Sequence, residues 1–209
     1  MVEYLYPPLG VFMFFLLLLL SCIQGKNYHH LYSKYSGYVS CNTKENIVGS
    51  GGFIRYKNKN YFISAKHVID SGECKQQYYC TYQGACRLIN EFYYLDGNNI
   101  TSDLVFIPTE TKGVKLKFYK PEQFDKVHFS SHPWGEKDAW ISEGTVAFID
   151  DSFFGINSFA APGSSGSVVF NKDKPIGIVI AIINTPYGID TGRVIAIRFD
   201  ENLIKSSLD

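Results

Sequence analysis

Residues 161–170 read Ala161-Pro162-Gly163-Ser164-Ser165-Gly166-Ser167-Val168-Val169-Phe170. Serines lie between glycines directly before a β-branched apolar run, which predicts a tight loop that leads into a buried strand. Such a loop can present one serine as a nucleophile while its own N–H groups point at an oxygen that becomes negative. Serine and glycine also gather in ordinary turns, so the interpretation depends on whether the chain supplies a base and an orienting carboxylate.

The composition favours an all-β chain without a nucleic-acid partner. The 209 residues carry 20 basic and 20 acidic side chains, and this balance gives no electrostatic reason to expect nucleic acid or an anionic membrane. Sixteen Phe, fifteen Tyr and eighteen Gly indicate strands with frequent turns. Strand signals recur about every ten residues without a long helical period, which predicts a barrel or a sandwich.

The N-terminus carries a targeting pattern, so residues 1–25 are interpreted as a signal peptide or membrane anchor. Residues 9–23 are almost wholly apolar but shorter than the roughly 20 apolar residues of a spanning helix, which suits a signal peptide. Residues 1–8 contain Glu3 and no Lys or Arg, which leaves membrane attachment through residues 9–23 open. The domain at 26–209 is therefore expected to be secreted or extracytoplasmic, with a membrane-anchored form as the alternative.

Four cysteines lie beyond this segment, namely Cys41, Cys74, Cys80 and Cys86, and the cysteine-rich segment that follows Ser71-Gly72 is expected to be a loop. Their even number suits an oxidising compartment and allows three pairings, among which the sequence does not choose. Their spacing does not match common zinc motifs, so no metal site is expected, and no cofactor is expected either.

Two further residues can complete a nucleophilic site with Ser165. A predicted hairpin over residues 49–65 ends close to His67, and Asp103 heads a short apolar strand that stops at Pro108. A serine needs a neighbouring imidazole to take its proton, and a carboxylate holds the tautomer of that imidazole and stabilises its cation. The order His67, Asp103, Ser165 permits this arrangement.

The segments around these residues resemble the catalytic blocks of the trypsin/chymotrypsin-like serine peptidases, in the order of that superfamily. The three blocks are residues 62–69 (FISAKHVI), 102–107 (SDLVFI) and 163–167 (GSSGS). Residues 129–135 (FSSHPWG) and 142–146 (SEGTV) are similar to the Gly-x-Pro-x-Gly turn and Ser-Gly-x-Val strand of the Deg-type, high-temperature-requirement branch. The sequence is therefore identified as closest to that branch or to the viral trypsin-like branch, without an appended peptide-binding domain.

The resemblance implies a fold and a site. It implies two packed six-stranded antiparallel β-barrels of the chymotrypsin type, over about residues 36–115 and 122–200. His67 would be the general base and acid, Asp103 its orienting partner and Ser165 the nucleophile that forms an acyl-enzyme. The backbone N–H groups of Gly163 and Ser165 would form the oxyanion hole.

Departures from the family carry further expectations. Trypsin-type zymogens place an Asp directly before the nucleophile, and Ser164 stands there, so no trypsin-type proteolytic activation is expected. The substrate pocket of this superfamily would lie near Phe159 and near Ile180, Ala181 and Ile182. These positions offer no Asp or His, which favours a small or apolar substrate side chain.

The sequence thus predicts a serine endopeptidase that acts on a protein or peptide substrate. Lys66 places a cation beside the base and leaves room for lowered activity. One alternative is therefore a weak or inactive relative that binds peptides or proteins. Another is a polyprotein-derived protease that processes itself.

Overall fold

The computed structural model describes residues 34–70, 72, 74–94, 100–184 and 190–208. The predicted signal or anchor segment, including the apolar run at 9–23, lies outside the described residues. None of the helices within the described ranges is long and apolar enough to cross a membrane.

The first half of the chain forms an eight-stranded sheet in the order β5-β4-β1-β2-β3-β7-β6, with β8 paired in parallel to β2. Its central strands are fully or largely buried because both faces are covered. The strands are β1 (Ser36–Cys41), β2 (Ile47–Tyr56), β3 (Lys59–Ser64), β4 (Gln77–Thr81), β5 (Cys86–Leu88), β6 (Tyr93–Tyr94), β7 (Val105–Thr109) and β8 (Val114–Lys115).

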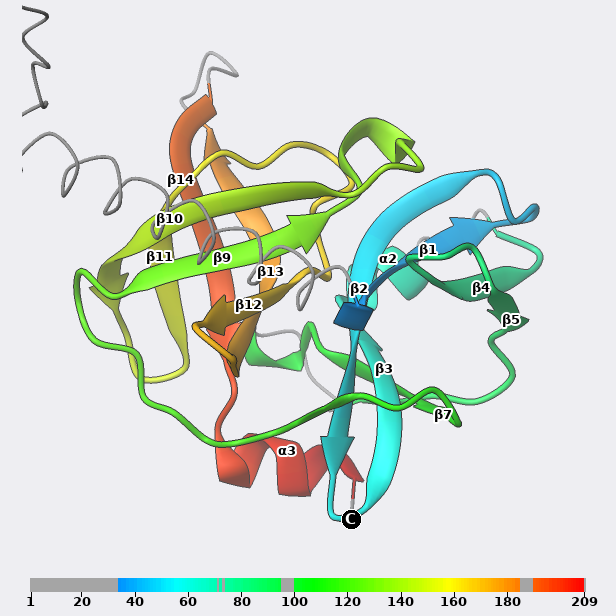
Figure 1. Cartoon of the computed structure of the whole chain (residues 1–209), viewed down its shortest axis with the longest axis horizontal. Helices are drawn as coiled ribbons and strands as arrows, with labels where there is room; N and C mark the ends of the chain where they lie inside the picture. Colours follow the sequence, from blue (N-terminus) through cyan, green and yellow to red (C-terminus); the bar gives the residue numbers. More distant parts are fainter. Residues whose placement is uncertain (1–33, 71, 73, 95–99, 185–189, 209) are drawn as a thin grey trace, which may run out of the picture.

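The second half forms a closed barrel in the order β10-β11-β14-β13-β12-β9. Its six pairs of neighbouring strands are all antiparallel. Figure 1 shows this barrel beside the first sheet. Its strands are β9 (Lys126–Ser131), β10 (Trp140–Ile149), β11 (Phe153–Asn157), β12 (Val168–Asn171), β13 (Lys174–Asn184) and β14 (Asp190–Arg198).

The predicted all-β fold class, with two packed units of the chymotrypsin type, is confirmed, and the second unit is the six-stranded antiparallel barrel that was expected. The first unit differs in detail. Its eight strands form a curled sheet, and the described residues show no pairing between β5 and β6 that would close it. The extra strand β4 lies in a cysteine-rich segment that we expected to be a loop, where Tyr79 and Cys80 are buried.

The two units share an apolar interface. One core cluster contains Phe53, Phe62 and Phe106 from the first sheet together with Val168 and Ile178 from the barrel. Burial of this surface is the main free energy that holds the two units together. The loops that leave both units at their common boundary are thereby held in a fixed relation.

Helix α3 (Glu201–Leu208) follows β14 and lies below the barrel in Figure 1. Asp200 caps this helix, since its Oδ1 accepts the backbone N–H of Asn202 at 2.9 Å. Ile204 is fully buried in the shared core cluster, which fixes the helix against the sheets.

Two disulfides link the four cysteines. Cys41 at the end of β1 pairs with Cys74, and Cys80 pairs with Cys86 across the β4–β5 hairpin. This is one of the three pairings that the sequence left open.

Candidate active site

His67 and Asp103 lie together at the end of the first sheet. His67 belongs to the one-turn helix α2 (Lys66–Ile69), which follows β3, and Asp103 follows the 3₁₀ turn η1 (Ile100–Ser102). Asp103 Oδ2 lies 2.7 Å from His67 Nδ1, and Asp103 Oδ1 accepts the backbone N–H of His67 at 2.8 Å. A carboxylate against Nδ1 places the ring proton there, so Nε2 keeps its lone pair and can accept a proton.

The ammonium group of Lys66 contacts Tyr94 and Asp70. Its Nζ lies 4.0 Å from the centroid of the Tyr94 ring and 3.9 Å from Asp70 Oδ2. The positive charge of Lys66 is therefore partly balanced by the Tyr94 ring and the Asp70 carboxylate.

Ser165 lies in the loop between β11 and β12, which two glycines shape. Gly163 and Gly166 have φ values of +95° and +93°, a backbone region that favours glycine. Ser164 and Ser167 are fully buried, whereas Ser165 is partly exposed. Ser165 is therefore the serine of this loop that an external substrate can reach.

The loop also presents unused backbone donors. Within the described residues, the N–H groups of Gly163 and Ser165 donate to no acceptor. The carbonyl of Pro162 accepts the N–H of Trp134 at 2.6 Å. Because N–H and C=O of a trans peptide point in opposite directions, this bond turns the N–H of Gly163 away from Trp134 and leaves it open. Two open N–H groups beside an accessible hydroxyl suit a developing oxyanion.

The start of β2 connects the two halves of the site. A Cβ on Gly49 would lie 2.5 Å from Val68 Cγ1, so α2 packs directly against the backbone of Gly49. The next residue, Ser50, donates its N–H to the carbonyl of Ser165 at 2.8 Å. Adjacent residues of one strand thus contact the helix of His67 and the loop of Ser165. The described residues show no hydrogen bond between the Ser165 hydroxyl and His67.

The turn after β9 packs beneath this loop. His132 is fully buried, with Nδ1 against the carbonyl of Glu136 at 3.0 Å, and burial lowers the pKa of His132. The ring is therefore neutral at neutral pH and donates from Nδ1. Trp134, in the 3₁₀ turn η2 (Pro133–Gly135), has a φ of +53° that non-glycine residues seldom adopt.

Three exposed aromatic rings form a cluster that includes Phe159, one of the residues expected to bind substrate. Trp134, Trp140 and Phe159 are 58%, 42% and 46% exposed, and their ring centroids lie 5.7–6.3 Å apart. Ala181 is exposed and Ile182 is half-buried. Ile180 is instead buried in the shared core cluster, since strand alternation turns its side chain to the same face as Ile178.

Sequence reasoning missed two contributors to this site. The Ser50 hydroxyl and the Trp134 N–H both bind carbonyls of the nucleophile loop. The run Gly49-Ser50-Gly51-Gly52 was interpreted only as the opening of a strand, although a polar residue among glycines in a buried strand is a usable signal.

Comparison with known proteins identifies the family. The family model of the trypsin-like peptidase domain matches residues 49–182, a range that contains His67, Asp103 and Ser165. The chain belongs to the trypsin-like peptidase family. This confirms the resemblance seen in the sequence. No curated protein matches the sequence of this trypsin-like peptidase domain.

Its fold is similar to that of a solved HtrA-type protease, AlgW, in a structure that holds a decapeptide. The TM-score is 0.65 at 14% sequence identity, and the match covers 86% of this chain and 65% of that chain. The chain therefore spans about two thirds of the length of that protein. At this identity the likeness is one of fold, and the fold is the one that the sequence predicted.

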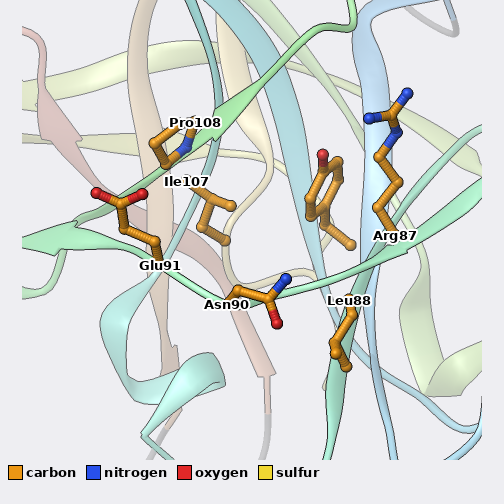
Figure 2. A pocket seen from close by; sticks show the side chains of 7 residues that line it. Arg87, Leu88, Asn90, Glu91, Ile107 and Pro108 are labelled. Atoms are coloured by element: carbon orange, nitrogen blue, oxygen red, sulfur yellow. The ribbon is translucent and has the colours of Figure 1, made fainter.

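The trypsin-like peptidase domain also has a cavity of about 510 Å³ on its first sheet, shown in Figure 2. It is lined by Tyr79, Arg87, Leu88, Asn90, Glu91, Ile107 and Pro108. None of the candidate catalytic residues lines this cavity, so we do not assign it to the chemistry of the site.

Proposed function

We propose that the chain is a serine endopeptidase in which Ser165 is the nucleophile, His67 the general base and acid, and Asp103 its orienting partner. The observation that carries the proposal is the double contact between the Asp103 carboxylate and His67. This contact fixes the ring with Nε2 free to take a proton. The helix that carries His67 packs against the start of β2, and the same part of β2 binds the loop of the accessible Ser165.

The chemistry follows from these positions. Nε2 of His67 takes the hydroxyl proton as Ser165 Oγ attacks the substrate carbonyl carbon, and Asp103 stabilises the imidazolium. The N–H groups of Gly163 and Ser165 bind the oxygen that becomes negative. The imidazolium then gives its proton to the leaving amine. A water molecule activated by His67 hydrolyses the acyl-enzyme and restores the free serine.

This enzyme needs no trypsin-type activation. Residues 47–49 (Ile-Val-Gly) mimic the start of an activated trypsin chain. Ile47, however, pairs with Ser40 inside the first sheet and is 8% exposed. Ser164 binds within its own loop, since its Oγ accepts the N–H of Ala161 at 3.1 Å. Neither residue requires a new N-terminal ammonium.

The substrate is a protein or peptide with a small or apolar side chain before the scissile bond. Phe159 belongs to the exposed aromatic group beside the loop, and Ala181 and Ile182 add apolar surface. Burial of an apolar side chain against these groups lowers the free energy of binding. Profiling on a peptide library tests this preference, and selection of Lys, Arg or Glu at that position would contradict it.

The two disulfides support an extracytoplasmic location, because the reducing cytosol keeps thiols from pairing. We propose secretion, or membrane attachment through residues 9–23, with residues 26–209 as the peptidase domain.

A second candidate is a weak or inactive relative that binds peptides. The observation that favours it is the missing hydrogen bond between the Ser165 hydroxyl and His67 in the described residues. Catalytic hydrogen bonds are often long before substrate binds, so we favour the enzyme. A fluorophosphonate probe separates the two: it labels the wild type and fails to label Ser165→Ala if the chain is a serine hydrolase. Equal labelling of both proteins, or of neither, would exclude Ser165 as an activated nucleophile.

A further inference from the structure

We propose that Ser50 is a positioning residue whose hydroxyl keeps the N–H groups of the oxyanion hole aimed at the substrate. This inference rests on the proposed function of the site. Ser50 lies in β2, is fully buried and faces the nucleophile loop. Its Oγ donates to the carbonyl of Gly163 at 2.6 Å and accepts the N–H of His132 at 2.8 Å. One hydroxyl thus links the turn after β9 to the loop that carries the open N–H groups.

The bonds of Ser50 fall on the two residues that supply those N–H groups. The hydroxyl binds the carbonyl of Gly163, and the Ser50 N–H binds the carbonyl of Ser165 at 2.8 Å. Each oxyanion donor is therefore anchored through its own carbonyl by one residue of a buried strand. The N–H groups are left to face the substrate.

Gly163 needs such an anchor. A glycine rotates freely about φ and ψ, so nothing in its own side chain keeps its N–H aimed at the substrate. Two hydrogen bonds supply the constraint, from Trp134 N–H to the carbonyl of Pro162 and from Ser50 Oγ to the carbonyl of Gly163. They fix the peptide planes on both sides of the Gly163 Cα, and with them the direction of its N–H.

The hydroxyl also acts within a connected chain of hydrogen bonds. The N–H of His132 donates to Ser50 Oγ, which in turn donates to Gly163, and such chains polarise one another. The carbonyl of His132 fits against Gly163 as well, because a Cβ there would lie 2.4 Å from it. Loss of the hydroxyl would loosen the turn and the loop together.

Ser50→Ala tests the proposal in the full chain, with the rate of fluorophosphonate labelling at Ser165 and the steady-state constants on a peptide ester as readouts. Loss of one direct oxyanion donor costs on the order of 10²–10³ in kcat, so an indirect loss through position should cost about 10- to 100-fold. We expect kcat and the labelling rate to fall by that factor, with KM changed by less than about threefold.

The control is Ser64→Ala. Ser64 is also fully buried, and its hydroxyl packs against Gly166 and donates to the carbonyl of Ser50 at 2.7 Å. Among the described residues it makes no hydrogen bond to the nucleophile loop, so its removal leaves the carbonyls of Gly163 and Ser165 bonded to Ser50. It should lower kcat by less than about threefold while it destabilises the fold about as much as Ser50→Ala, because each removes a buried hydroxyl. Equal losses of kcat in the two variants would overturn the proposal.

The pair Ser50→Thr and Ser50→Val isolates the hydroxyl, since the two side chains have nearly the same shape. Thr should keep at least about tenfold more activity than Val at a temperature where both proteins are fully folded. Equal activity of this pair, or unfolding of Ser50→Ala itself, would show a purely structural role. A wild type that is not labelled at Ser165 would refute the proposed function instead, so the two failures are distinguishable.

Discussion

The carboxylate of Asp103 binds His67 twice, once at the backbone N–H and once at ring Nδ1. The first bond fixes the start of helix α2, and the second fixes the tautomer of the ring. One acidic side chain therefore sets both the place and the protonation pattern of the proposed base.

Asp103→Asn should lower kcat by about 10⁴-fold, because an amide N–H facing Nδ1 favours the tautomer in which Nε2 carries the proton. The fold should survive, since Asn can still accept the backbone N–H of His67. Steady-state kinetics on a peptide ester and thermal unfolding check both expectations. Asp70→Asn removes a carboxylate from the far end of the same helix and serves as the control, with little change in kcat. A loss below tenfold in Asp103→Asn would contradict the assignment.

Gly166→Ala should cost more stability than the matched change Gly84→Ala. Both glycines have positive φ, +93° and +84°, so each alanine meets a backbone penalty of about 1–2 kcal/mol. A Cβ at Gly166 would also lie 1.9 Å from the carbonyl oxygen of Ser50, whereas nothing lies within 4 Å of one at Gly84. Chemical denaturation should show a difference of about 2 kcal/mol or more, as overpacking usually costs. Equal losses would mean that the loop moves away from β2 freely.

Removal of each disulfide should lower the free energy of unfolding by a different amount. Cys41 and Cys74 are 33 residues apart, and Cys80 and Cys86 are 6 apart. Loop-closure entropy predicts about 1.5 kcal/mol more stabilisation from the longer loop. Denaturation of Cys41→Ser/Cys74→Ser and Cys80→Ser/Cys86→Ser proteins measures the difference. A larger loss from the short loop would show that the β4–β5 hairpin depends on its disulfide for more than entropy.

His132 should make the stability of the protein depend on pH. Burial lowers its pKa in the folded protein below the ordinary value of 6.5, so the unfolded chain binds this proton at higher pH than the folded chain. The free energy of unfolding should therefore be fully maintained above about pH 6.5 and fall as the pH drops toward the folded pKa. His132→Asn, whose amide can donate to Glu136 in place of Nδ1, should show a flatter profile. Parallel profiles of the two proteins would exclude His132 as the source.

The order of the proposed triad could be predicted from the sequence because each residue sits in a local pattern. His67 follows a strand, Asp103 precedes one, and Ser165 lies between glycines that a tight loop requires. The second barrel was predicted for the same reason, since its strands are regular and its turns contain Gly, Asn and Pro.

The missed features depend on contacts between distant parts of the chain. Ser50 is 113 residues from Gly163 and 82 residues from His132 in the sequence. The residues next to Ser50 in the sequence do not indicate either partner. Strand β4 was missed because its sequence has the cysteines and polar flanks of a loop. Its pairing with β1 and the Cys80–Cys86 bond stabilise it as a strand. Ile180 was placed near the substrate by analogy, whereas its side chain packs between the two units.

The aromatic group beside the nucleophile loop gives the protein a built-in optical probe. The chain has two tryptophans, Trp134 and Trp140, and their rings lie 5.7 Å apart on that surface. Indole emission reports the polarity of its surroundings, and the backbone of Trp134 is bonded directly to the proposed oxyanion loop. Tryptophan fluorescence, excited selectively over that of the tyrosines, therefore comes entirely from one edge of the site. Peptide or inhibitor binding there can be followed in the native chain without any added label.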